Sequence, residues 1–119
     1  MSQQLRILPE EFPNSDASYN LILFNVEDEN FEQLNELDET IGIEVSNNGI
    51  TCYCVTNDEG DVFYGNTSLD AFGDTIKSVT VEQFLNALKY YKPDNYTNRA
   101  VIAYLKELLK ELRLFLYWH

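Results

Sequence analysis

The chain has 119 residues, which favours one domain spanning residues 1–119 with an ordinary hydrophobic core. Its hydrophobic fraction of 45% is too high for a disordered chain. Its formal net charge is −12, which disfavours direct binding to nucleic-acid phosphates or to an anionic membrane surface, because both need a basic face on the protein.

The charge is divided unevenly along the chain. Residues 1–74 contain sixteen acidic side chains and one basic side chain, Arg6, whereas residues 75–119 contain four acidic and seven basic side chains. The stretch from Phe24 to Gly42 alone contains seven carboxylates and no Lys or Arg. Such a stretch favours a basic protein partner, and the alternative is that the acidity serves only solubility.

The first residues, MSQQLRILPEEF, contain no apolar segment typical of a signal peptide, and no apolar run is long enough to span a membrane. We therefore expect a cytoplasmic protein without a membrane partner. Residues 1–17 contain two prolines and are expected to form an N-terminal arm or an edge strand.

The next two elements are a strand and a helix. Residues 18–26, SYNLILFNV, are almost continuously apolar, which is typical of a central strand covered on both faces. Phe31, Leu34 and Leu37 then recur at helical spacing. We expect a helix over about residues 29–39, capped by Asp28 or Asn30 and followed by Gly42.

After Gly42 the apolar pattern changes to a period of two. It predicts strands near residues 42–46, 50–56 and 61–65. Asn48-Gly49 indicates a tight hairpin turn, and residues 57–60 indicate a longer one. The three strands are expected to form a meander.

Two helices are expected to complete the chain. Thr80 and Gln83 form a capping box at the start of the first, and Pro93 lies beyond its end. The segment from Thr97 to His119 reads as one long helix, because its leucines recur at helical spacing. The order β-α-β-β-β-α-α predicts an α+β fold, with a mostly antiparallel sheet of about four strands and three helices on one face.

The aromatic end of the chain, Leu114–His119, has two interpretations. It packs into its own domain, as terminal segments that dock usually do. Alternatively it forms part of an exposed interface, where Trp and Tyr often anchor a partner.

No set of residues indicates catalysis. The single histidine, His119, is the last residue of the sequence, where we do not expect it to serve as a catalytic base. Neither a serine nor Cys52 or Cys54 is therefore expected to have a histidine partner. The two cysteines are expected to be buried, reduced thiols. Residues 57–61, NDEGD, resemble part of a calcium loop but lack its distal glutamate. No glycine-rich loop precedes a helix. We expect no enzymatic activity, no cofactor and no metal site.

The clustered carboxylates are therefore the predicted binding residues. The first group lies on the expected helix and its ends, and the second lies in the turn after residue 56. The predicted partner-binding residues are Glu27, Asp28, Glu29, Glu32, Glu36, Asp38, Glu39, Asp58, Glu59 and Asp61. Whether the two groups share one face is left open by the sequence.

A small, acidic chain with clustered carboxylates from Glu27 to Glu39 and no catalytic set resembles the immunity proteins of bacterial toxin–immunity pairs. The resemblance implies a protein that binds a basic toxin, foremost a nuclease, and covers its active cleft with an acidic surface. The same features also resemble nucleic-acid mimics, which inhibit DNA- or RNA-binding proteins. A scaffold or adaptor and a small metal-binding domain are the remaining alternatives.

Overall fold

The structure is a computed structural model that describes residues 4–9, 22–45, 50–56, 62–67, 69–70 and 72–118. For residues 50–56 and 62–67 it describes the backbone. Of the predicted binding residues, Asp58, Glu59 and Asp61 lie outside the described residues, as does the turn at Asn48-Gly49.

The centre of the fold is a five-stranded sheet in which every neighbouring pair of strands is antiparallel. Its order is β2-β1-β7-β6-β3. The strands are β1 (Gln4–Pro9), β2 (Ile22–Asn25), β3 (Ile43–Glu44), β6 (Lys77–Thr80) and β7 (Arg113–Trp118). The predicted α+β class and the antiparallel sheet are confirmed, with one strand more than expected.

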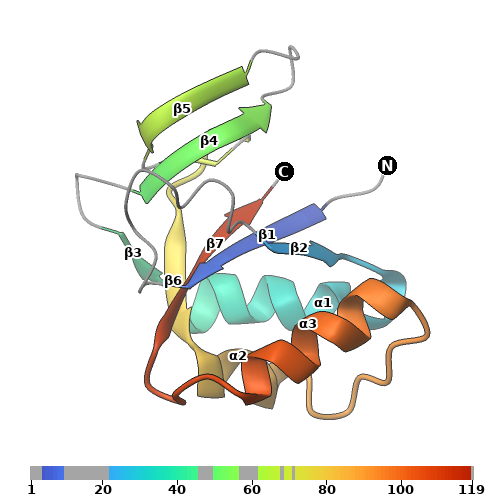
Figure 1. Ribbon diagram of the computed structural model, residues 1–119. Coiled ribbons are helices and arrows are strands. Elements are labelled where there is room, and N and C mark those ends of the chain that lie inside the picture. The colour runs from blue at the N-terminus through green and yellow to red at the C-terminus, as the bar shows by residue number, and fades with distance from the viewer. Residues whose placement is uncertain are drawn as a thin grey trace.

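Three α-helices cover one face of this sheet (Figure 1). They are α1 (Asp28–Glu36), α2 (Val81–Ala87) and α3 (Tyr96–Lys106), and a π-helical turn, η2 (Leu37–Ile41), extends α1. The core lies between the two layers, where Phe24 of β2 meets Phe84 of α2 edge to face with ring centroids 5.5 Å apart. The helix predicted near residues 29–39 is therefore present, as is the capping box of Thr80 and Gln83.

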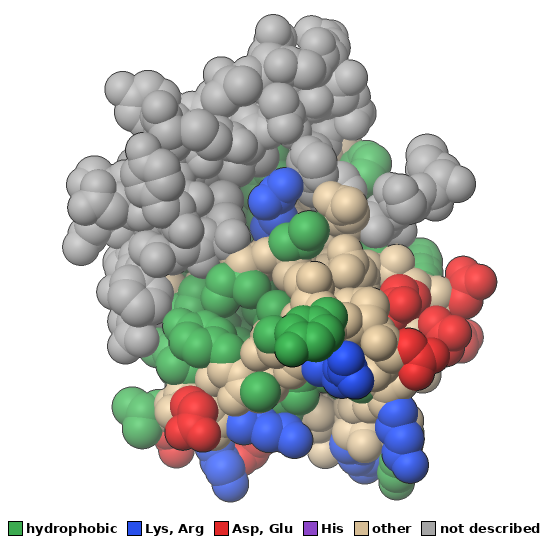
Figure 2. Space-filling view, turned by 45° about the vertical axis from the view of Figure 1, so that its right-hand side comes forward, with side chains coloured by type: hydrophobic (Ala, Val, Ile, Leu, Met, Phe, Trp, Pro, Cys, Tyr) green, Lys and Arg blue, Asp and Glu red, His purple; other side chains and the backbone are tan. Residues whose placement is uncertain are grey.

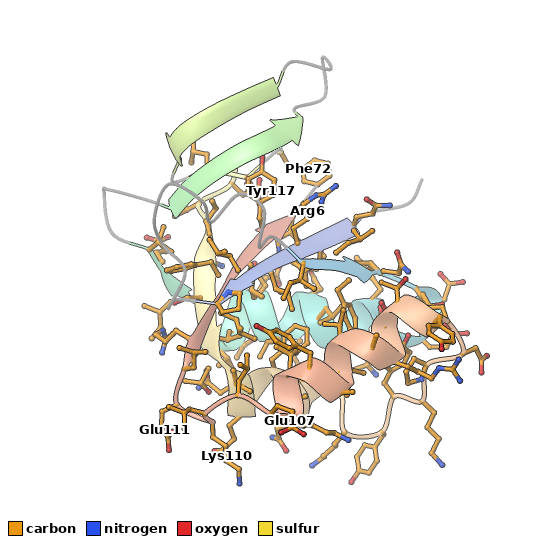
Figure 3. All side chains as sticks on the ribbon, in the orientation of Figure 1. Arg6, Phe72, Glu107, Lys110, Glu111 and Tyr117 are labelled. Atoms are coloured by element: carbon orange, nitrogen blue, oxygen red, sulfur yellow. The ribbon has the colours of Figure 1, made fainter. Side chains whose placement is uncertain are left out.

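The strands β4 (Ile50–Thr56) and β5 (Val62–Thr67) form a separate two-stranded sheet. The predicted strands near 50–56 and 61–65 are thus present and paired. The predicted meander is wrong, because β3 pairs with β6 instead of β4. Figure 1 shows the β4–β5 hairpin on the side of the main sheet that faces away from the helices. Arg6 and Tyr117, which are register partners, also lie on that side (Figure 3).

The predicted long C-terminal helix is wrong in its second half. Helix α3 ends at Lys106, and β7 occupies the middle of the sheet between β1 and β6. Leu114, Leu116 and Tyr117 are fully or almost fully buried. The aromatic end therefore packs into its own domain, as a central strand and not as a docked helical tail.

The positions of the first two strands also differ from the expectation. The prediction placed residues 18–26 at the centre and residues 1–17 at an edge or in an arm. Instead β2 is the edge strand, and β1 lies between β2 and β7 with Leu5, Ile7 and Leu8 fully buried. The apolar run in β2 reflects its contact with the helices, since Phe24 is the fully buried residue in that strand.

Candidate functional site

The outer face of α1 carries a row of carboxylates. Asn30, Leu34 and Leu37 are buried beneath the helix. The opposite side therefore faces solvent, and Asp28, Glu32 and Glu36 follow one another there at intervals of one turn. Figure 2 shows a group of Asp and Glu side chains at the right-hand edge of the molecule, with Lys and Arg side chains beside and below it.

We define the acidic face as the exposed carboxylates of α1 and η2. Its members are Asp28, Glu29, Glu32, Glu36 and Glu39. All five were predicted to bind a partner, and the helix brings the first four onto its solvent side. The α1 N-terminus favours Asp28 and Glu29 through the helix dipole.

Glu27 has a structural position that the sequence prediction did not identify. Its side chain accepts hydrogen bonds from the Tyr91 hydroxyl, from Asn95 Nδ2 at 3.0 Å and from Asn98 Nδ2 at 3.4 Å. Its backbone N–H donates to Asn30 Oδ1 at 2.8 Å. Glu27 therefore joins the start of α1 to the start of α3, and its carboxylate is committed within the fold.

Asn98 completes this polar connection between distant parts of the chain. Its side chain is fully buried, donates to the Asn25 carbonyl at 2.8 Å and accepts from the Asn25 N–H at 2.8 Å. The edge strand β2 thereby gains hydrogen-bond partners on its open side. Burial raises the pKa of Tyr91, and its hydrogen bond to Glu27 raises it further, so the hydroxyl stays protonated.

Asp38 also differs from the exposed carboxylates. The π-helical turn places it beside β6, where its Oδ2 lies 3.7 Å from Lys77 Nζ. Burial raises its pKa, while hydrogen bonding to Trp118 and the Lys77 charge act in the opposite direction. The backbone of Gly42 lies close to the Asp38 carbonyl oxygen. A Cβ at position 42 would lie 2.5 Å from that oxygen, so the position requires glycine.

A hollow of about 450 Å³ opens where α1 passes into η2. Asp38 and Glu39 line one side of it, and Glu44, Asp70 and Asp74 line the rest, together with Lys77 and Trp118. We call it the acidic hollow. Glu39 belongs to the acidic face and also lines the acidic hollow, so the hollow adjoins the acidic face.

Asp70 organises the far wall of the acidic hollow. Its Oδ1 accepts the N–H groups of Phe72 at 2.9 Å and of Asp74 at 3.0 Å, which closes a tight turn that includes Gly73 at φ 84°. The side chain is 7% exposed. Burial raises its pKa, and the charges of Asp74 and Asp38 raise it further. The hydrogen bonds from the Asp74 and Phe72 N–H groups lower it in turn, so the charge of Asp70 is opposed by burial and by two acidic neighbours and is supported by the turn itself.

Glu44, Asp70 and Asp74 were not among the predicted binding residues. They come from a short strand and a turn that tertiary structure brings to the end of α1. Asp70 and Asp74 around Gly73 indicate a turn in the sequence, but this local pattern does not predict that the turn lies near the end of α1.

The described part of the chain contains no group of three His, Cys, Asp or Glu side chains that could hold a metal ion. Within the same residues, no helix has both the length and the apolar character needed to cross a membrane.

No family model matches the chain, and neither the curated proteins nor the solved structures yield a match. Function is accordingly inferred from the residues and their geometry.

Proposed function

We propose that this chain is an immunity-type binding protein that neutralises a basic toxin, foremost a nuclease, by covering the toxin's active cleft. The observation that carries the proposal is that the acidic hollow adjoins the acidic face. A nuclease cleft must attract phosphates, so it presents Lys and Arg side chains. A row of carboxylates is complementary to such a cleft.

The electrostatics of the free protein support a partner. Glu32 and Glu36 lie one turn apart, where like charges repel by a few tenths of a kcal/mol. In the acidic hollow, Asp70 and its acidic neighbours repel one another. A cationic partner relieves this repulsion and is drawn in faster at low ionic strength.

The acidic hollow would be the centre of the interface with the partner. Arg or Lys from the partner would enter it between Glu39 and Asp74, and bidentate contacts to a carboxylate would orient an arginine. Phe72 is 41% exposed on its rim, and Ile43 is 59% exposed on the adjoining β3. These side chains offer apolar contact beside the charges, as the centres of protein interfaces usually do.

The test compares two variants with the same change in net charge. Glu32→Lys with Glu36→Lys reverses the acidic face, whereas Glu107→Lys with Glu111→Lys reverses two exposed carboxylates elsewhere (Figure 3). Each protein is immobilised and incubated with lysate of the source organism, then washed with salt. We expect one basic protein to remain on the wild type and on the Glu107/Glu111 variant, and to be lost from the Glu32/Glu36 variant.

The retained protein is then purified and assayed for cleavage of DNA and RNA. Addition of an equimolar amount of the wild-type chain should abolish its activity, while the Glu32/Glu36 variant should not. If the two variants retain the same set of proteins, binding follows net charge alone and the proposal fails. If the retained protein binds DNA or RNA without cleaving it, and the wild-type chain displaces that nucleic acid, the nucleic-acid-mimic alternative replaces the proposal.

A further inference from the structure

A second hollow, of about 440 Å³, lies between α2 and α3 and has the opposite charge. Lys89, Lys92, Arg99 and Lys106 line it, and among the described residues that line it there is no Asp or Glu. Its floor is apolar and includes Leu85 and Ile102, which are half-buried. We call it the basic groove.

The concentration of cations in the basic groove is unexpected for this chain. The sequence contains eight Lys and Arg against twenty Asp and Glu, yet four of the eight line this one groove. Among the described residues the single ion pair is that of Lys77 with Asp38. None of the four groove cations is thus paired with a described carboxylate, although paired surface charges of both signs are the usual pattern.

Neighbouring aromatic rings hold two of the cations. Lys89 Nζ lies 5.1 Å from the ring centroid of Tyr90, and the Arg99 guanidinium lies 5.2 Å from that of Tyr96. The two rings are 86% and 80% exposed. Contact with a ring restricts the rotamers of the cation, so less side-chain entropy is lost when a ligand binds. Tyr and Arg are also enriched among the residues that contribute most to binding energy at interfaces.

The wall of the basic groove is fixed by the polar connection described above. Tyr91 lines the groove, donates its hydroxyl hydrogen to Glu27 and accepts a hydrogen bond from Asn98 Nδ2 at 2.9 Å. The groove is therefore a preformed feature of the helix layer, and a ligand need not organise it.

We propose that the basic groove binds an acidic amphipathic segment of a protein, with an apolar side chain on the groove floor and carboxylates beside the four cations. The apolar floor favours a peptide over a nucleic-acid strand, because a strand offers no aliphatic side chain. The net charge of −12 also repels a long polyanion more than it repels a short segment. This site is separate from the acidic face and does not depend on the proposed function.

The test uses a fluorescent helical peptide that carries leucine on one face and glutamate along both flanks, titrated against the full chain. Two control peptides replace the glutamates with glutamine or the leucines with serine. Lys92→Glu and Lys106→Glu alter the basic groove, and Lys110→Glu makes the same charge change at an exposed site outside it (Figure 3). All three side chains are exposed, so the variants should fold.

We expect each groove variant to weaken binding of the acidic peptide by about five- to tenfold, and Lys110→Glu to leave it within about twofold. Both control peptides should bind more weakly than the parent. Equal binding of the glutamine peptide, or equal weakening by Lys110→Glu, would overturn the proposal. So would a single-stranded oligothymidine, or vesicles containing phosphatidylglycerol, if either bound the groove more tightly than the peptide. The Glu32/Glu36 variant should still bind the peptide, which separates this site from the acidic face.

Discussion

The carboxylate of Glu27 accepts three hydrogen bonds at the junction of β2, α1 and α3. Glu27→Ala should therefore lower the free energy of unfolding by about 2 kcal/mol, because the Tyr91 and Asn98 side chains lose an acceptor in a partly buried site. Urea denaturation measures the change. Asp28→Ala is the control, because Asp28 is exposed and contributes chiefly through the helix dipole. Equal losses for the two variants would show that the polar junction does not contribute.

The carboxyl group of Asp70 carries a testable dependence on pH. Its pKa in the folded protein is raised above the usual aspartate value of 3.8, chiefly by burial. The folded state therefore disfavours the charged form, and this cost disappears as the pH falls through the raised pKa towards 3.8. Asp70→Asn keeps an oxygen acceptor for Phe72 and Asp74. It should be more stable than the wild type at pH 7, and the difference should shrink as the solution is acidified.

Asp70→Ala is the companion variant for this experiment. It removes the acceptor that closes the turn, so it should be less stable than Asp70→Asn by about 1 kcal/mol, measured by urea denaturation across the pH series. An Asp70→Asn protein that is less stable than the wild type at neutral pH would contradict the inference that the folded state disfavours the charged form of Asp70.

Strand β7 decides the architecture at the level of the elements. Leu114 is fully buried in it, while Leu109, in the connection that precedes it, is 76% exposed. Leu114→Ala should lower the free energy of unfolding by about 3 kcal/mol, and Leu109→Ala by less than about 0.5 kcal/mol. Denaturant titration of both variants checks this contrast. A larger loss at Leu109 than at Leu114 would instead fit the helix that the sequence pattern predicts, because Leu109 lies on the apolar stripe of that helix and Leu114 on its opposite side.

The sequence pattern misleads in this segment for a physical reason. A central strand covered on both faces is apolar at successive positions, so β7 lacks the alternation that identifies a strand. Phe115 and Leu116 happen to continue the apolar helical spacing that runs through α3, and no Gly or Pro separates the two elements. Pairing with β1 and β6 then determines the conformation, and no property of residues 113–118 alone reveals those partners.

Elements with local signals were predictable. The capping box of Thr80 and Gln83 located α2, and the apolar spacing of Leu34 and Leu37 located α1. The exposed carboxylates of the acidic face were predictable for the same reason, since they lie on one helix. The acidic hollow and the basic groove were not, because each combines side chains from elements far apart in the sequence.

The uneven charge of the whole molecule predicts a response to salt. With a net charge of −12, repulsion among carboxylates opposes the compact state, and salt screens that repulsion. Raising sodium chloride from low concentration to about 0.2 M should increase the free energy of unfolding, by on the order of 1 kcal/mol.

Two variants locate the source of this salt effect. Glu32→Lys with Glu36→Lys should reduce it more than Glu107→Lys with Glu111→Lys, because the first pair lies within the acidic face and the second pair outside it. The measurement is denaturant unfolding at a series of salt concentrations. An equal reduction would mean that only total charge matters, and a fall in stability with added salt would contradict the repulsion itself.

The position of β7 between β1 and β6 also affects the order in which the protein can assemble during its synthesis. Until residues 113–118 have left the ribosome, β2–β1 and β3–β6 are two separate ladders, each with one edge that awaits a partner. Leu5 must then wait for Trp118, more than a hundred residues later, before that part of the sheet can close. A nascent chain stopped short of β7 would display two open edges and an uncovered apolar layer, the features that chaperones and proteases recognise.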